Sequence, residues 1–231
     1  MHLLAIITIL FVIYCSSESI ANIARHAGAR TTFFPLGLML SNQIYSINRL
    51  NGFLIAPLLG LYVDTGGNEA HLKGAAIIGC VASALLLLIF LQIWPIFLAN
   101  FSQILQNMKS GGFSIKLFNG ISRKVDRKIH RFSSKRYDGA LIFAQSICTS
   151  LAMPTAFILN ILALRYPDYK ATLVQSATVI SGIGNLILNF YISPRIALAE
   201  TQGDPDGEYF SAMVGKIFGI GVIASCAIAI L

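Results

Sequence analysis

The residues of this sequence best suited to chemistry are charged and amide side chains that lie inside long apolar tracts. The clearest is Arg49, which stands between Asn48 and Asn51 in an otherwise apolar stretch. A charge within a membrane helix costs at least a few kcal/mol, so it normally faces a partner or a wet cavity. A guanidinium stays charged and binds phosphate oxygens in a bidentate manner. Arg49 is therefore either a cation for an anionic substrate, a structural partner of Glu18 or Asp64, or a cap for the carbonyl groups of a broken helix.

Other polar residues in the apolar tracts have a more ordinary interpretation. Amide side chains within membrane helices usually form hydrogen bonds between helices. Arginines and lysines near helix ends, such as Arg25 and Arg30, commonly extend toward lipid headgroups. Small residues that permit close helix packing include Gly215 and Gly219, which are spaced as in a G-x-x-x-G pattern.

Signatures of an enzyme are missing from this sequence. It contains no HExxH, no GxSxG and no phosphate-binding glycine-rich loop followed by a lysine. The four cysteines are scattered singly, which predicts free thiols rather than a metal site or a disulfide framework. The sequence therefore favours a protein that is not an enzyme and that needs neither a metal nor a cofactor.

The composition predicts that a lipid bilayer is the solvent of the chain. Hydrophobic residues make up 55% of its 231 positions, charged residues only 12%, and the mean hydropathy is +0.71. A membrane helix needs about 20 mostly apolar residues. The expected fold is an all-α, polytopic integral membrane protein that forms one domain over residues 1–231. About six spans are expected, at residues 3–23, 33–63, 74–98, 139–164, 171–192 and 210–231.

The second tract, residues 33–63, is too long for one straight crossing. As a single helix it would be about 45 Å long, more than the thickness of the hydrocarbon core. It also contains Asn51-Gly52 and Pro57. We therefore expect it to be strongly tilted or broken near residues 51–57.

The segment 99–138 should form a cytoplasmic basic loop, because it holds nine of the 17 lysines and arginines. Apolar residues recur in it at intervals of three or four from Ile115 to Phe132, with basic residues such as Arg123 and Arg127 between them. This pattern predicts an amphipathic basic helix held at the interface by anionic membrane lipids. We do not expect a nucleic-acid partner. Counting spans from this loop puts the 24–32 turn inside the cell and both termini outside.

Several short motifs of the first half resemble the Amj family of bacterial membrane proteins. They comprise Ala24-Arg25-His26-Ala27-Gly28-Ala29-Arg30-Thr31, Ser41-Asn42, Asn48-Arg49-Leu50-Asn51 and Ala56-Pro57-Leu58-Leu59-Gly60 with Asp64. The resemblance implies a lipid II flippase of the bacterial cytoplasmic membrane, which carries the undecaprenyl-pyrophosphate-linked peptidoglycan precursor from the inner to the outer leaflet. Either a groove opens sideways to lipid, or two copies act as a homodimer.

Under this hypothesis the polar residues of the first half line the hydrophilic path of the substrate. The candidate substrate-binding residues are Asn22, Arg25, Arg30, Asn42, Arg49 and Asn51, with Glu18 or Asp64 balancing their charge. Three alternatives remain open at this point: a transporter of a smaller anionic solute, a membrane scaffold that transports nothing, and a transferase acting on a polyprenyl phosphate.

Overall fold

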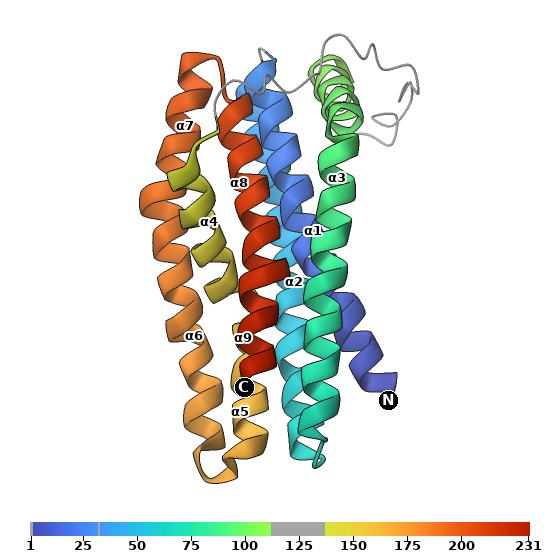
Figure 1. Ribbon diagram of the computed structural model, residues 1–231. Helices are drawn as coiled ribbons and strands as arrows, with labels where there is room; N and C mark the ends of the chain where they lie inside the picture. The colour runs from blue at the N-terminus through green and yellow to red at the C-terminus, as the bar shows by residue number, and fades with distance from the viewer. Residues whose placement is uncertain (1, 32, 112–136) are drawn as a thin grey trace.

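The computed structural model describes residues 2–31, 33–111 and 137–231, and their regular structure is helical (Figure 1). The first half of the chain forms three long helices: α1 (His2–Arg30), α2 (Phe34–Asp64) and α3 (Glu69–Gly111). The predicted amphipathic basic helix falls mostly within residues 112–136, outside the described residues.

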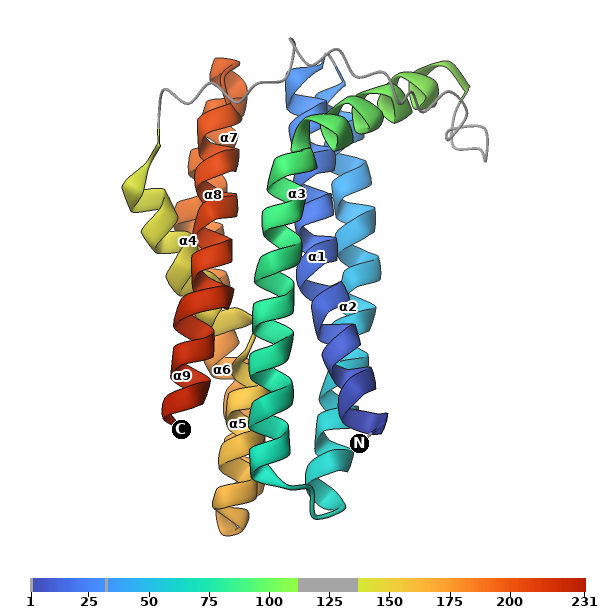
Figure 2. The same ribbon diagram turned by 45° about the vertical axis from the view of Figure 1, so that its right-hand side comes forward.

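The second half of the chain is built from shorter helical pieces. In chain order these are α4 (Gly139–Ala152), α5 (Thr155–Arg165), a 3₁₀ turn (Pro167–Tyr169), α6 (Lys170–Ile187), a π-helical segment (Leu188–Ile192), α7 (Ser193–Gln202), α8 (Asp206–Phe218), a second π-helical segment (Gly219–Ala224) and α9 (Ser225–Ile230). Figure 2 shows α1–α3 grouped on one side of the bundle and α4–α9 on the other. The two groups are the N-terminal half and the C-terminal half below.

The helices confirm a multi-pass membrane protein, but the predicted number of six spans is not confirmed. Among the described residues, four continuous helical stretches are long and apolar enough to cross a membrane: His2–Arg30, Glu69–Lys109, Pro167–Gln202 and Asp206–Ile230. The pair α4 and α5, bent by 43° at a short break, would make a fifth. Large apolar side chains such as Phe53, Phe143 and Phe190 are exposed, as expected for a surface that faces lipid.

Of the two alternatives for the second tract, the break near residues 51–57 is excluded, because α2 runs as one helix from Phe34 to Asp64 with Pro57 inside it, and the tilt stays a prediction. A proline removes a single helical hydrogen bond, which neighbouring structure can compensate in a membrane helix. At 31 residues the helix is about 46 Å long. The helix α2 is not one of the four stretches that are apolar enough to cross a membrane, because its middle contains polar residues around Asn48 and Arg49.

Prolines explain two further differences from the predicted spans. The span expected at 139–164 is broken into α4 and α5 next to Pro154, which cannot donate the next helical hydrogen bond. The span expected at 171–192 instead continues through Pro194 to Gln202. A π-helical segment, Leu188–Ile192, ends two residues before that proline, and π-helical turns are a recognised way in which a long helix adjusts near a proline.

Glycines permit the closest helix contacts in the bundle. A Cβ atom on Gly28 of α1 would lie 2.7 Å from the Cα atom of Gly37 of α2. A Cβ atom on Gly215 would lie 2.5 Å from the carbonyl oxygen of Ile142, and one on Gly219 equally close to that of Ser146. The packing role predicted for the Gly215 and Gly219 pattern is therefore confirmed.

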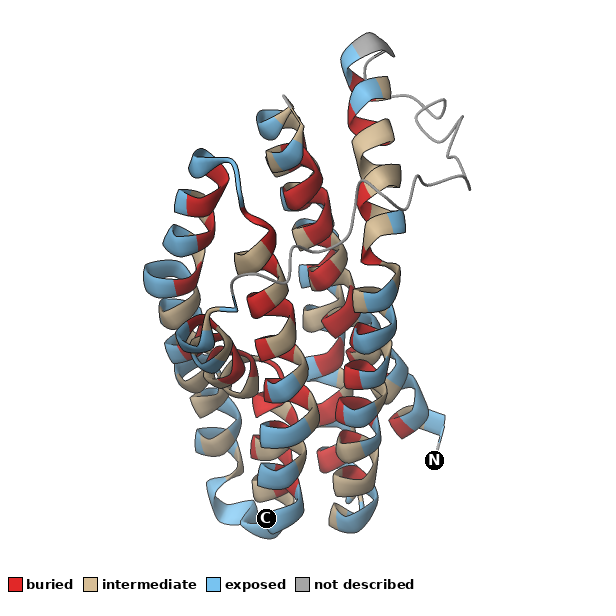
Figure 3. Ribbon diagram, turned by 45° about the horizontal axis from the view of Figure 1, so that its top comes forward, coloured by how far each residue is buried: buried red, intermediate tan, exposed pale blue. Residues whose placement is uncertain are grey.

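Burial follows the inner faces of the helices, where they turn toward one another (Figure 3). The bundle has two ends. We call the end at Arg30 and at residues 203–205 the loop end, because α3 also ends there, next to the segment that carries the predicted basic loop (Figure 1). The end at residues 65–68 and 166–169 is the opposite end.

Candidate functional site

A column of polar side chains runs along α1 where the N-terminal half meets the C-terminal half. We call it the polar seam. Its α1 members recur every three or four residues and so share one side of the helix. The seam consists of Glu18, Asn22, Arg25, His26 and Arg30 with their partners Tyr45, Trp94, Glu200, Asp206, Tyr209 and Lys216.

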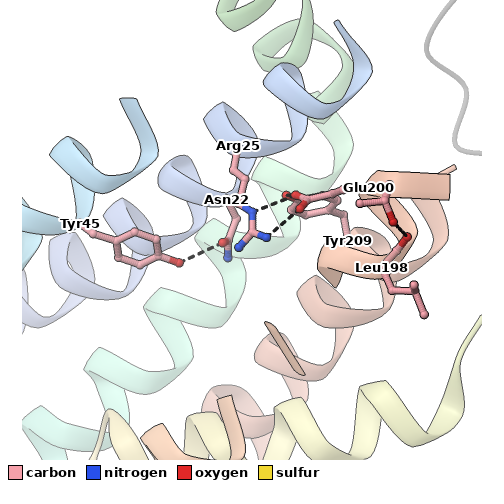
Figure 4. Close-up of polar contacts among 7 residues, drawn as sticks. Asn22, Arg25, Tyr45, Leu198, Glu200 and Tyr209 are labelled. Atoms are coloured by element: carbon pink, nitrogen blue, oxygen red, sulfur yellow. Dashed lines mark hydrogen bonds and ion pairs between the residues drawn. The ribbon is translucent and has the colours of Figure 1, made fainter. Parts of the chain in front are cut away.

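Arg25 and Glu200 form the strongest contact of the seam (Figure 4). The guanidinium donates from Nε to Oε1 at 2.8 Å and from a terminal nitrogen to Oε2 at 2.7 Å. The hydroxyl of Tyr209 donates to the same carboxylate at 2.5 Å. Glu200 is almost fully buried, with 2% of its side chain exposed, against 21% for Arg25. One turn before Arg25, the amide oxygen of Asn22 accepts a hydrogen bond from Tyr45 of α2 at 2.9 Å.

His26 joins both halves through a second set of contacts. The indole N–H of Trp94 donates to its Nδ1 at 3.2 Å, and Nε2 lies 2.8 Å from Oδ1 of Asp206. Because an indole nitrogen can only donate, Nδ1 must be unprotonated, so Nε2 carries the hydrogen and donates to Asp206. The ring also stacks on Tyr209, with centroids 4.3 Å apart. Arg30 lies 3.6 Å from the other oxygen of Asp206. His26 is thus a neutral, buried connector.

The seam continues into the middle of the bundle as an ion pair between Glu18 and Lys216. Their charged atoms are 3.1 Å apart. Only 2% of the Lys216 side chain is exposed, and 15% of that of Glu18. Lys216 belongs to α8, three residues before the π-helical segment Gly219–Ala224. A buried pair of ionisable side chains therefore lies among apolar helices at the depth of Glu18.

The opposite end is also joined by ion pairs between the halves. Arg165, the last residue of α5, lies 2.5 Å from Glu69 at the start of α3, and Lys170 pairs with Asp64. These pairs are more exposed than those of the seam. Five of the seven ion pairs among the described residues, leaving out the neutral His26, join the two halves: two at this end, two at the loop end and one in the middle.

The structure divides the predicted site residues into two groups. Asn22, Arg25 and Arg30 lie on the polar seam, as does Glu18. The others belong to α2: Asn42 and Arg49 are exposed, Asn51 is partly buried, and Asp64 is exposed at the opposite end.

Arg49 does not have the structural partners that the sequence left open. Glu18 pairs with Lys216 and Asp64 with Lys170, and within the described part of the chain Arg49 forms no ion pair. Its neighbour along the exposed face is Asn42, which borders a shallow hollow of about 750 Å³. That hollow is lined by α2 residues alone: Pro35, Leu38, Met39, Asn42, Gln43, Ser46 and Ile47.

Sequence reasoning missed the partners of the seam, which are Glu200, Asp206, Tyr209, Lys216 and His26. A signal existed for Lys216, which is a charged residue within the apolar tract 210–231. Glu200 and Asp206 were expected to lie in a loop, because the predicted span 171–192 ends before them.

The site is suited to binding rather than to bond chemistry. Its cations are held by carboxylates, and its one histidine is stacked and hydrogen-bonded on both nitrogens. No group of three or more histidines, cysteines and acids in the described ranges could hold a metal ion. The polar seam therefore places cations, each paired with a carboxylate, at several depths along the interface between the two halves.

Comparisons with known proteins identify the family of the chain. The family model Amj, described as "Alternate to MurJ", matches residues 9–223. A relative from Bacillus subtilis (strain 168), named Lipid II flippase Amj, is 25% identical over 202 residues, which cover 79% of this chain and 74% of the relative. No solved structure matches the chain. Since the family model spans nearly the whole sequence, including every residue of the polar seam, the chain belongs to the Amj family.

Proposed function

We propose that this protein is a lipid II flippase of the bacterial cytoplasmic membrane. It carries the undecaprenyl-pyrophosphate-linked disaccharide-pentapeptide from the inner to the outer leaflet. Membership of the Amj family and the name of the Bacillus subtilis relative support this assignment. The structural observation that carries it is the polar seam, because a charged column through an apolar bundle is a feature of substrate pathways.

The ion pairs at both ends of the interface suit a protein that opens one end at a time. At the loop end, Arg25 and Arg30 hold Glu200 and Asp206. At the opposite end, Lys170 and Arg165 hold acids of the N-terminal half. Separating one set while the other holds would expose the seam to one side of the membrane only. In this proposal the basic loop faces the cytoplasm and α2 provides the sixth crossing.

The exposed face of α2 is the proposed lateral entrance for the lipid. A guanidinium facing hydrocarbon without a partner is costly, yet Arg49 is exposed on this face. A pyrophosphate would supply the missing partner while the prenyl tail stays in the bilayer. Asn42, which lies two turns before Arg49 on the same face, would contact the polar headgroup, whereas Asn51 lies about half a turn from Arg49 and so on the other side of α2. Such a sideways groove also explains how a chain of 231 residues handles a large cargo.

Two further partners belong to the proposal. Anionic lipids would bind the basic loop, and Lys109, at the end of α3, lies over the ring of Phe33. A second copy of the chain would cover α6, where Gln175, Thr178 and Asn185 are exposed on one face. Amides on a lipid-facing surface are typical of helices that hydrogen-bond to another helix. Disulfide trapping of dimers through Thr178→Cys, in a protein without its own cysteines, tests the second partner.

The test of function is lipid translocation by purified protein. Proteoliposomes with lipid II in the inner leaflet should expose it outside in a protein-dependent manner, measured by an impermeant enzyme that modifies only outer lipid II. Expression should also restore growth to a bacterial strain depleted of its lipid II flippase. Transport of a small soluble anion without lipid translocation would replace the proposal by a solute transporter. Covalently altered lipid II would indicate a transferase.

A further inference from the structure

Lys216 is an unusual residue to find in the core of this bundle. An ammonium group has three N–H donors, yet the buried Nζ atom makes no hydrogen bond within the described residues and lies beside a single carboxylate. Burying such a pair contributes little to stability, because apolar residues of similar volume stabilise a protein as well or better. The pair Glu18 and Lys216 is therefore better explained by binding than by folding.

Other polar atoms without partners lie at the same depth. Five buried side-chain polar atoms in the described ranges lack a hydrogen bond. Four of them lie near the depth of the Glu18 and Lys216 pair: Ser19 Oγ, Asn48 Oδ1, Ser83 Oγ and Lys216 Nζ. Ser19 follows Glu18 in the chain. Ser83 contacts the thiol of Cys15, which is within electrostatic range of both Glu18 and Lys216.

The register of α1 against α2 places Asn48 at this depth. The two helices are antiparallel, since Asn22 bonds to Tyr45 and Tyr14 lies against Gly52. Asn48, halfway between these contacts, is therefore level with Glu18. Buried polar atoms without protein partners normally bind water or a ligand. The layer consequently has the donors and acceptors of a polar ligand site.

The same register puts Arg49 level with Glu18, on the outer side of α2. The phenol of Tyr14 is within electrostatic range of both charges. Glu18 is the more exposed member of its pair and Lys216 the more buried. In the proposed path, a group that enters past Arg49 would meet the more exposed Glu18 before it reaches the ammonium. An entering anion would have to take the place of the carboxylate.

We propose that Lys216 binds the diphosphate of the lipid substrate in the middle of the membrane, and that Glu18 is the counter-ion released when it does so. A diphosphate carries more negative charge than one carboxylate and presents more acceptor oxygens. It can therefore use the ammonium donors that Glu18 leaves unfilled. The hydroxyls of Ser19 and Ser83 would donate to the same group. This inference rests on the proposed function.

The experiment compares binding and transport in matched variants. The double variant Glu18→Gln/Lys216→Gln leaves no unpaired charge and keeps both side chains near their natural size, so it should fold. Purified protein in nanodiscs is titrated with radiolabelled undecaprenyl diphosphate, and undecaprenol serves as the uncharged control. The double variant should bind the diphosphate at least tenfold more weakly than wild type. Glu18→Gln alone should bind it as tightly as wild type or more tightly, because the competing carboxylate is gone.

Each outcome separates this inference from the proposed function. A folded double variant that binds the diphosphate like wild type and translocates lipid II overturns the role of Lys216 but leaves the flippase assignment standing. If wild-type protein binds the diphosphate but translocates no lipid II, the binding site at Lys216 stands and the flippase assignment is wrong. Wild-type protein that binds undecaprenol as tightly as the diphosphate contradicts the inference directly. Arg195→Gln, at an exposed pair within the C-terminal half, is the control for loss of a cation elsewhere.

Discussion

Replacing Glu200 by glutamine should loosen the loop end of the bundle. Its carboxylate accepts two hydrogen bonds from Arg25 and one from Tyr209, and it is nearly inaccessible to water. Glutamine has a similar shape, but one of its two polar atoms is a donor. That NH₂ group cannot accept a bond from Arg25, and the guanidinium is left without its counter-charge. The variant therefore isolates the charge-assisted contact between α1 and α7.

The expected size of the effect follows from the burial of the two partners. Removing one member of a buried ion pair costs about 3–5 kcal/mol, because a charge is left uncompensated. Arg25 remains one-fifth exposed, so water can solvate part of it. We therefore expect a loss below that range, about 2–3 kcal/mol in the free energy of unfolding. For a chain of this size, 1 kcal/mol corresponds to about 2–4 °C in Tm, so Tm should fall by roughly 5–10 °C.

A thiol-reactive fluorescent dye can measure this change in detergent. Cys15, Cys80 and Cys148 are buried and become reactive only when the bundle unfolds, while the exposed Cys226 is replaced by serine in every sample. Lys73→Gln is the control, since Glu69 keeps its pair with Arg165, and its Tm should stay close to wild type.

A second variant separates charge from packing. Arg25→Gln combined with Glu200→Gln removes both charges. Its Tm should therefore recover more than half of the decrease expected for Glu200→Gln alone. A Tm for Glu200→Gln within 2 °C of wild type would refute the view that this contact holds the loop end together. Equal losses in the single and double variants would show that side-chain packing, rather than charge, matters there.

Three other predictions use different properties of the molecule. Gly215→Ala should lower Tm by several degrees, because its Cβ atom would meet the carbonyl oxygen of Ile142. Gly60→Ala is the control and should leave Tm unchanged, because nothing lies within 4 Å of a Cβ atom there; equal Tm values for the two variants would contradict the packing. Arg49→Gln should accumulate as folded protein at the wild-type level yet lose lipid II transport, with loss of folded protein as the contrary result. In intact cells, an impermeant thiol reagent should label Asn68→Cys but not Ser110→Cys; the reverse would invert the topology.

The fold class could be predicted because it depends on composition and local pattern. Long apolar tracts require helices in a bilayer, and the pattern of Gly215 and Gly219 identifies a close helix contact. Helix ends and breaks were less predictable. Pro57 and Pro194 remain inside helices, whereas Pro154 coincides with a break. What decides between these outcomes is packing around each proline, which the local sequence does not contain.

The candidate site could be predicted in part, since spacing along one helix reveals which residues share a side. Glu18, Asn22 and Arg25 follow one another at helical intervals, so their common location on the seam is implicit in the sequence. Their partners Glu200 and Lys216 lie 175 and 198 residues away from Arg25 and Glu18 in the chain. Pairing over that distance depends on the rotation of α7 and α8 about their axes, which no local pattern specifies.

Arg49 shows why depth and orientation have to be considered separately. The apolar tract correctly suggested a cation far from both helix ends, and the register of α2 against α1 puts it level with Glu18. Its orientation, however, is outward, so the carboxylate at that depth pairs with Lys216 instead. The result is two cations at one level, an exposed one on α2 and a buried one on α8 that pairs with Glu18. An anion moving from lipid to the seam would exchange the first cation for the second, and this exchange requires Glu18 to move aside.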